Sequence, residues 1–72
     1  MRFELDGKYI ILKTNKKEVR LLPTVLSVHK LYDRISDARK ETRRFGKEYN
    51  IFKFAGLGVT SDGKFTSVFE KV

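Results

Sequence analysis

The sequence predicts a single α+β domain over residues 1–72. Its expected form is a small antiparallel sheet of four to five strands with one main amphipathic helix packed on one face, in the order β-β-β-α-β-β. Three observations lead to this class. Two Asp-Gly pairs lie near the two ends of the chain, between runs of strand-forming residues. A helical apolar period occupies the middle. Finally, 72 residues leave no room for a second domain.

The first hairpin is expected around Asp6-Gly7, which separates Arg2–Leu5 from Lys8–Lys13. Asp-Gly between such runs favours a type I′ turn, which needs positive φ at both central residues. Asn15-Lys16 indicates a further tight turn.

A third strand is expected over Glu18–Leu21, where the alternation places Val19 and Leu21 on one face. Pro23 ends this strand or lies on an edge, because proline cannot donate a hydrogen bond to a ladder.

The middle of the chain is predicted to be helical over 36–48, with a helix that begins earlier and is capped by Thr24 or Ser27. In the alternative, Ser36 is the N-cap and Val25–Lys30 extends a strand. Gly46 is either the residue that ends the helix or an interior glycine. The apolar stripe behind this prediction consists of Val28, Leu31, Tyr32, Ile35, Ala38, Thr42, Phe45 and Tyr49.

Two further strands are expected over Ile51–Thr60 and Lys64–Lys71, joined at Asp62-Gly63. Gly56 and Gly58 inside the first of them indicate a bulge or a close approach of backbone. We expect the phenylalanines of both strands to form the core, because so small a domain has few other large apolar groups. They are Phe52, Phe54, Phe65 and Phe69.

The net charge indicates which kinds of partner the protein binds. Sixteen Lys and Arg against nine Asp and Glu give a formal net charge of +7, and such a field favours polyanions: nucleic acid or an acidic protein face. The chain has no cysteine and one histidine, His29, so a thiolate nucleophile, a common zinc site and a conventional triad are all excluded. We therefore expect no enzyme activity, no cofactor and no metal. No apolar run is long enough to span a membrane. We therefore expect a cytoplasmic location and no membrane partner.

The helix sorts its charges by sign, and its basic residues form one continuous sector beside the apolar stripe. Like charges spaced four residues apart repel by a few tenths of a kcal/mol per pair, so helix stability alone would favour mixed signs. A solvated face whose charges match the helix dipole is the alternative interpretation. The sector contains Arg39, Arg43, Lys47, Lys40 and Arg44.

A second basic cluster follows the first hairpin, and a solvated, aggregation-resistant strand edge is its alternative interpretation. If it lies beside the helix sector, the two form a groove that spans several phosphates. The predicted partner-binding residues of this cluster are Lys16, Lys17 and Arg20, with Lys13 next to them.

Three functions fit these features. The first is a small, non-enzymatic protein that binds DNA or RNA with low specificity through phosphate neutralisation. The second is an accessory protein, in the style of those that phages use against host machinery, which binds and inhibits or modulates a larger host protein through an acidic face or a strand edge. The third is a structural subunit that self-assembles through a Phe-rich sheet face, and a homodimer stays open.

Overall fold

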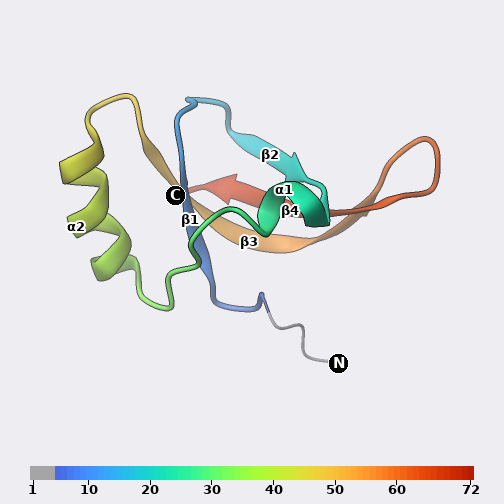
Figure 1. Ribbon diagram of the computed structural model, residues 1–72, viewed down its shortest axis with the longest axis horizontal. Helices are drawn as coiled ribbons and strands as arrows, with labels where there is room; N and C mark the ends of the chain where they lie inside the picture. Colours follow the sequence, from blue (N-terminus) through green and yellow to red (C-terminus); the bar gives the residue numbers. More distant parts are fainter. Residues whose placement is uncertain (1–4) are drawn as a thin grey trace.

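The computed structural model describes residues 5–72 and confirms the α+β class (Figure 1). Four antiparallel strands form one sheet in the order β1-β3-β4-β2, accompanied by a short helix and a main helix. In chain order the elements are β1 (Tyr9–Leu12), β2 (Glu18–Leu21), α1 (Pro23–Leu26), α2 (Ile35–Phe45), β3 (Asn50–Val59) and β4 (Phe65–Lys71).

The turn at Asp6-Gly7 is present, but it is not of type I′. The Lys8 N–H donates to the Leu5 carbonyl at 3.0 Å. Gly7 has a φ of 74°, while no described residue other than glycine has a positive φ. Positive φ at the second central residue alone is typical of a type II turn. The strand expected over residues 2–5 lies outside the described residues except for Leu5, which belongs to this turn.

The C-terminal hairpin is confirmed, again with a different turn. The Gly63 N–H donates to the Thr60 carbonyl at 2.9 Å, and the Thr60 N–H donates to the Lys64 carbonyl at 2.8 Å. Gly63 has a φ of 84°, whereas Asp62 does not reach positive φ. A turn followed by one left-handed glycine matches the three-residue loop with a bulge, in which only the glycine needs positive φ.

The tight turn expected at Asn15-Lys16 is wrong. β1 and β2 are the two outer strands and run in opposite directions, so residues 13–17 reverse the chain by crossing the ends of β3 and β4 and not in a tight turn. Two hydrogen bonds hold this crossover: the Asn50 side-chain amide donates to the Thr14 carbonyl at 2.7 Å, and the Lys71 N–H donates to the Lys17 carbonyl at 2.8 Å.

Residues 22–35 follow neither of the two predictions made for them. Pro23 ends β2, as expected, and begins the short helix α1, where its fixed φ suits the first helical position. Further along, Tyr32 exchanges two backbone hydrogen bonds of 2.8 Å with Tyr9 of β1. A residue bonded in this way cannot belong to a helix, so Val28 and Leu31 lie outside α2. No strand forms over residues 25–30.

The main helix is shorter than expected at its C-terminus. It begins at Ile35, after Arg34 in extended conformation rather than after a Ser36 cap. Gly46 ends it, with a φ of 119° and its N–H donating to the Thr42 carbonyl at 3.1 Å. Lys47 and Tyr49 therefore follow the helix instead of lying on it.

The core occupies one face of the sheet. Phe52 and Phe69 are 0% exposed, and Phe54 contacts Phe69 edge-on with ring centroids 5.6 Å apart. Leu26 of α1 packs against this cluster. The prediction is wrong for Phe65, which is 67% exposed because it lies where the β3–β4 hairpin extends past the core.

The main helix contacts β1 and β3 (Figure 1). Because strand residues alternate between faces, Ile11 and its neighbour Ile51 point away from the phenylalanine cluster. Phe45 and Ile11 line one hollow, while Arg43 and Ile51 line another. The helix thus lies on the second face of the sheet, at its β1 end.

Of the two alternatives expected for the β3 glycines, the bulge is confirmed, and Gly58 is instead packed closely by side chains. The register between β3 and β4 shifts between Phe54 and Gly56, and Gly56 has a φ of 138°. At Gly58 an added Cβ would lie 3.0 Å from the Thr66 hydroxyl oxygen and 3.2 Å from a Val68 methyl. Glycine therefore permits a bulge at the first position and close packing at the second.

The core assignment predicts different costs for two phenylalanine truncations. Phe52→Ala should lower the free energy of unfolding by about 3–5 kcal/mol, because it leaves a cavity in the buried cluster. Phe65→Ala should change it by no more than about 0.5 kcal/mol, because its ring is mostly in solvent. Urea denaturation at low micromolar protein concentration measures both. Equal losses would contradict this core.

Candidate functional site

A groove lined by basic residues lies along the second half of α2 and the turn that follows it. Arg39 and Arg43 lie one helical turn apart, and Lys47 follows where the chain leaves the helix. Arg39, Arg43 and Tyr49 line a hollow of about 320 Å³. A second hollow, lined by Arg43, Lys47 and Tyr49, adjoins it. We call these four residues, with Thr42 and Asn50 between them, the basic groove.

Local structure explains why these residues meet. Ala38 is fully buried, and the Thr42 hydroxyl donates to its carbonyl, so this side of α2 faces the sheet with the arginines at its margin. The chain then reverses at Gly46, and the Tyr49 N–H donates to the Gly46 carbonyl at 3.2 Å. This turn places the Tyr49 ring 5.4 Å from the Phe45 ring and beside the arginines.

The cations of the groove form no ion pair within the described part of the chain, although Glu48 lines a hollow together with Lys47. None of the ion pairs found there includes Arg39, Arg43 or Lys47, and all three residues are exposed. An uncompensated cluster of cations attracts anions over several ångströms at physiological salt. The ion pairs that do form join Lys8 to Asp33, Lys13 to Glu48, Arg20 to Glu18, Arg44 to Glu41 and Lys64 to Asp62.

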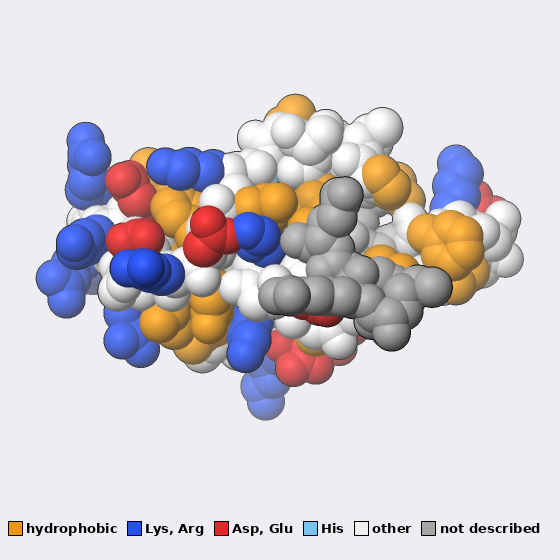
Figure 2. Space-filling view, turned by 90° about the horizontal axis from the view of Figure 1, so that it is seen from below, with side chains coloured by type: hydrophobic (Ala, Val, Ile, Leu, Met, Phe, Trp, Pro, Cys, Tyr) orange, Lys and Arg blue, Asp and Glu red, His pale blue; other side chains and the backbone are white. Residues whose placement is uncertain are grey.

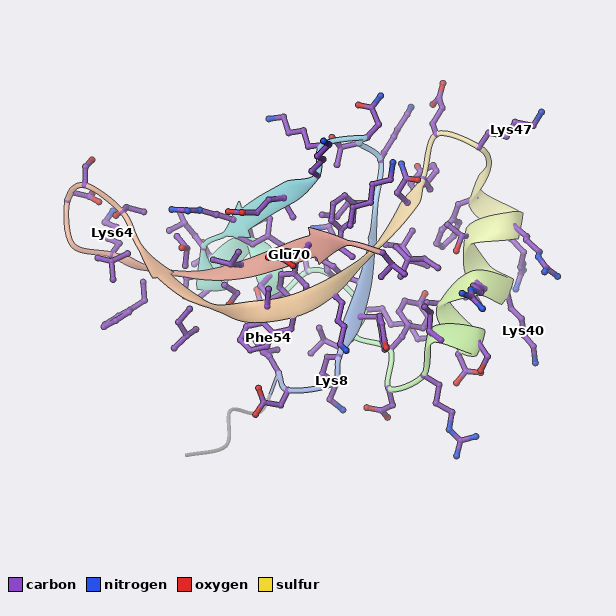
Figure 3. The ribbon with its side chains drawn as sticks, turned by 180° about the vertical axis from the view of Figure 1, so that it is seen from behind. Lys8, Lys40, Lys47, Phe54, Lys64 and Glu70 are labelled. Carbon is purple, nitrogen blue, oxygen red and sulfur yellow. The ribbon has the colours of Figure 1, made fainter. Side chains whose placement is uncertain are left out.

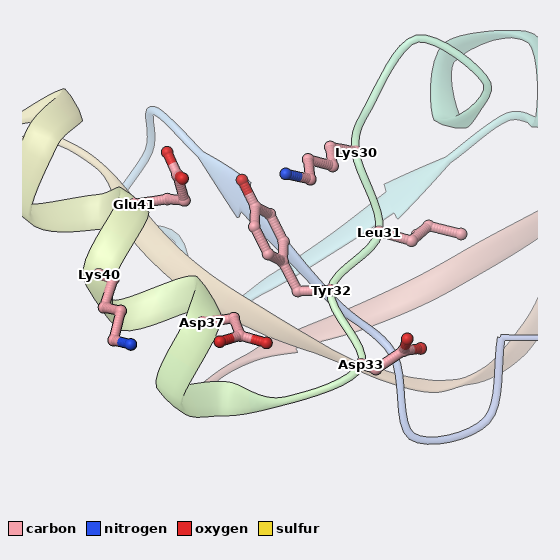
Figure 4. A pocket seen from close by; sticks show the side chains of 7 residues that line it. All are labelled: Lys30, Leu31, Tyr32, Asp33, Asp37, Lys40 and Glu41. Carbon is pink, nitrogen blue, oxygen red and sulfur yellow. The ribbon is translucent and has the colours of Figure 1, made fainter.

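Two of the predicted helix residues lie apart from the groove. Lys40 lines a different hollow together with Asp37 and Glu41 (Figure 4), and Arg44 lies 3.9 Å from the Glu41 carboxylate. An ion pair offsets the charge of Arg44, while Lys40 shares its hollow with two acids. The predicted sector of five basic residues divides into three that share a groove and two that border acids.

The second predicted cluster joins the groove in part. Lys13 and Asn15 of the crossover line one hollow with Lys47 and Asn50, although the Lys13 ammonium also lies 3.1 Å from Glu48. Lys16 and Lys17 are exposed on the same crossover, and the backbone of Lys17 is tied to Lys71 at the end of β4. They extend the basic surface across this end of the sheet.

Arg20 lies elsewhere. It sits within β2, its side chain pairs with Glu18 at 3.0 Å, and its guanidinium approaches Gly58 of the neighbouring hairpin. Lys and Arg side chains gather at the α2 end of the molecule in Figure 2, whereas the hairpin at the other end shows a hydrophobic patch with few charged side chains. Figure 3 likewise shows Lys40 and Lys47 projecting from the α2 end, opposite Lys64.

Tyr49 and Asn50 are the groove residues that sequence reasoning did not identify. Tyr49 fits the apolar stripe of a longer helix, and only the end of α2 at Gly46 turns it toward the basic side chains. No sequence pattern marks Asn50, because its role depends on contact with Thr14, which is distant in sequence.

His29 and Lys30 do not join the groove. His29 is half-buried in a hollow beside Ile11 and Phe45. The Lys30 ammonium lies over the Tyr32 ring, 5.1 Å from its centroid, where a cation–π attraction holds it. In the described part of the chain, no three His, Asp or Glu side chains gather closely enough to hold a metal ion.

Comparison with known protein families, with curated protein sequences and with solved structures finds no significant match to this chain. Within residues 5–72, no helix is both long enough and apolar enough to cross a membrane.

The hollow beside Lys40 contains a tyrosine with an altered pKa. The Tyr32 side chain is buried and its hydroxyl points toward Glu41 (Figure 4). Burial, and secondarily the negative charge of Glu41, raises the pKa of the Tyr32 phenol above the ordinary value of 10.0. The phenol is therefore neutral at physiological pH.

This pKa shift predicts a loss of stability in alkali. Above pH 10 the unfolded chain loses the Tyr32 proton more readily than the folded chain, so the folded state binds more protons and stability falls as pH rises. Ultraviolet titration should show one tyrosine ionising above 10.0 that disappears in Tyr32→Phe. A late transition that persists in that variant would refute the assignment.

Proposed function

We propose that this protein is a small, non-enzymatic nucleic-acid-binding protein that holds DNA or RNA by its phosphates, with low sequence specificity, in the basic groove. The observation that carries the proposal is the convergence of Arg39, Arg43 and Lys47 on one groove without an ion-pair partner in the described part of the chain. Arginine and lysine at such spacing suit a row of phosphates.

The neighbouring groups support the same proposal. Lys16 and Lys17 lie on the crossover at the same end of the sheet, so a strand leaving the groove past Lys47 meets further cations. Tyr49 offers a half-buried ring and Asn50 an amide beside the arginines. Aromatic rings stack on bases of every type, which adds affinity without strong sequence preference. The absence of cysteine fits a cytoplasmic location for this activity.

An acidic protein surface is the competing partner, because it carries the same charge. The two partners differ in their response to salt. Nucleic acid releases condensed counterions when it is bound, so the affinity falls with a log–log slope of about 0.7–0.9 per neutralised phosphate. A protein surface has no such condensed layer and should show a shallower dependence.

The test is a fluorescence anisotropy titration with labelled single- and double-stranded oligonucleotides at several salt concentrations. The double variant Arg39→Gln/Arg43→Gln should bind more weakly than the unmodified protein, and its log–log salt slope should be lower by about 1.4–1.8, because two phosphate contacts are lost.

The control is Arg20→Gln/Lys64→Gln, which removes the same amount of charge at exposed positions that do not line the groove. It should keep the slope of the unmodified protein. If both variants lose affinity equally, net charge rather than the groove is responsible. If the folded protein does not bind either oligonucleotide at low salt, nucleic acid is not the partner and an acidic protein face takes its place.

A further inference from the structure

The end of the molecule opposite α2 consists of the distal half of the β3–β4 hairpin, residues 55–67, which we call the arm (Figure 1). β1 pairs with β3 only as far as Lys53, and β2 pairs with β4 only from Ser67 onward. No described strand therefore pairs with the β3 side of the arm. Such an edge presents unpaired backbone groups to a further strand.

The free backbone groups can be assigned from the hairpin hydrogen bonds. The Thr60 N–H points inward, since it donates to Lys64. In an antiparallel ladder the inward and outward directions alternate, so Gly58 also points inward. Leu57 and Val59 then direct their N–H and C=O groups outward, at the free edge.

One face of the arm is apolar and exposed. Val59 pairs with Phe65 and Leu57 pairs with Ser67, which places all four side chains on the face that carries Phe69 in the core. Leu57, Val59 and Phe65 are 49%, 56% and 67% exposed. Ser67 on this face is buried, but beyond it the face continues the core outward with Leu57, Val59 and Phe65 exposed, and apolar strand edges of this kind favour association.

We propose that the arm binds a second copy of this chain, edge to edge, about a two-fold axis at Gly58. In this antiparallel register, Leu57 exchanges two backbone hydrogen bonds with Val59 of the second copy, and Val59 does the same with Leu57. The two Gly58 residues form the closely spaced, non-hydrogen-bonded pair between them. A two-fold axis requires a self-complementary edge. This edge is self-complementary, because the outward backbone groups of Leu57 in one copy pair with those of Val59 in the other, and the reverse.

Charge favours a second copy over an acidic partner at this surface. The arm contains one acid and one base, Asp62 and Lys64, which lie 3.8 Å apart. The Arg20 guanidinium that approaches Gly58 is itself paired with Glu18 at 3.0 Å, so the arm offers little net positive field to an acidic protein. The basic groove lies at the other end of a molecule 36 Å long (Figure 3). At physiological salt, charges are screened over about 8 Å. In two copies joined at their arms, the basic ends are therefore too far apart to repel each other.

The dimer does not depend on the proposed nucleic-acid binding, and it is tested without nucleic acid. Sedimentation equilibrium from about 10 μM to 1 mM should show a concentration-dependent rise toward twice the 8.4 kDa of one chain. Amide hydrogen exchange at Leu57 and Val59 should slow as the concentration rises, because these N–H groups bond only in the dimer.

Two variants act on different parts of the contact. Val59→Pro removes an N–H that has no partner in the single chain, and proline is tolerated at a free edge, so the fold should remain and the dimer should be lost. Leu57→Lys places like charges beside the axis and should also give a single-chain mass. Val28→Lys, at a residue 80% exposed outside the arm, adds the same charge and should leave the dimer intact.

Three results would overturn the proposal. They are a single-chain mass at every concentration, a dimer that survives both Val59→Pro and Leu57→Lys, and a dimer in which the Leu57 and Val59 amides exchange as fast as in the single chain. The last would place the contact on another surface.

Discussion

The rest of the structure depends on the antiparallel pairing of β3 with β4. β1 joins the sheet only through β3, and β2 only through β4, so the two outer strands meet through this hairpin alone. Each outer strand has four residues, too few for an independent hairpin in water. The contact between Phe54 and Phe69 fixes the two central strands to each other, and Ile10 and Val19 from the outer strands pack around it.

A single bulge divides that hairpin into two parts with different properties. On the core side of Gly56, α1 contacts β4 and Leu26 packs on the phenylalanine cluster, while α2 contacts β1 and β3. Beyond Gly56 the strands leave the core, and Leu57, Val59 and Phe65 on their apolar face are exposed. The bulge also increases the local twist. The arm is therefore a direct extension of the interior of the sheet, which explains why its residues resemble core residues in the sequence.

The two ends of the molecule differ in electrostatics as well. Arg39, Arg43 and Lys47 repel one another, and every ion pair found in the described part of the chain joins an acid to a different cation. The cost is a few tenths of a kcal/mol per pair, which an exposed and hydrated cluster tolerates. Binding of an anion would convert this repulsion into attraction. The arm is close to neutral and apolar, so charge-driven and apolar contacts are kept at opposite ends.

The limits of sequence reasoning are visible at particular residues. The strands and the C-terminal hairpin followed from alternation and Asp-Gly, but the type I′ turns did not form, because glycine alone takes positive φ in both loops. Apolar residues recur at helical spacing from Val28 to Tyr49, but the helix covers only part of this range. Tyr32 bonds to Tyr9 of β1 before it, and the helix ends at Gly46. The sequence predicts Phe65 to be a core residue, since none of its neighbours in the chain indicates that the strand extends beyond the core.

By itself the sequence determined the α+β class, the C-terminal hairpin, an irregularity at the β3 glycines and the pairing of Arg39 with Arg43 on one helix face, because each depends on residues close together in the chain. Only the tertiary structure decided the spatial order β1-β3-β4-β2, the separation of Arg20 from the groove, the inclusion of Tyr49 and Asn50, and the exposure of the arm. These features arise from contacts between segments that are distant in sequence, such as Asn50 with Thr14, and a local pattern carries no record of such contacts.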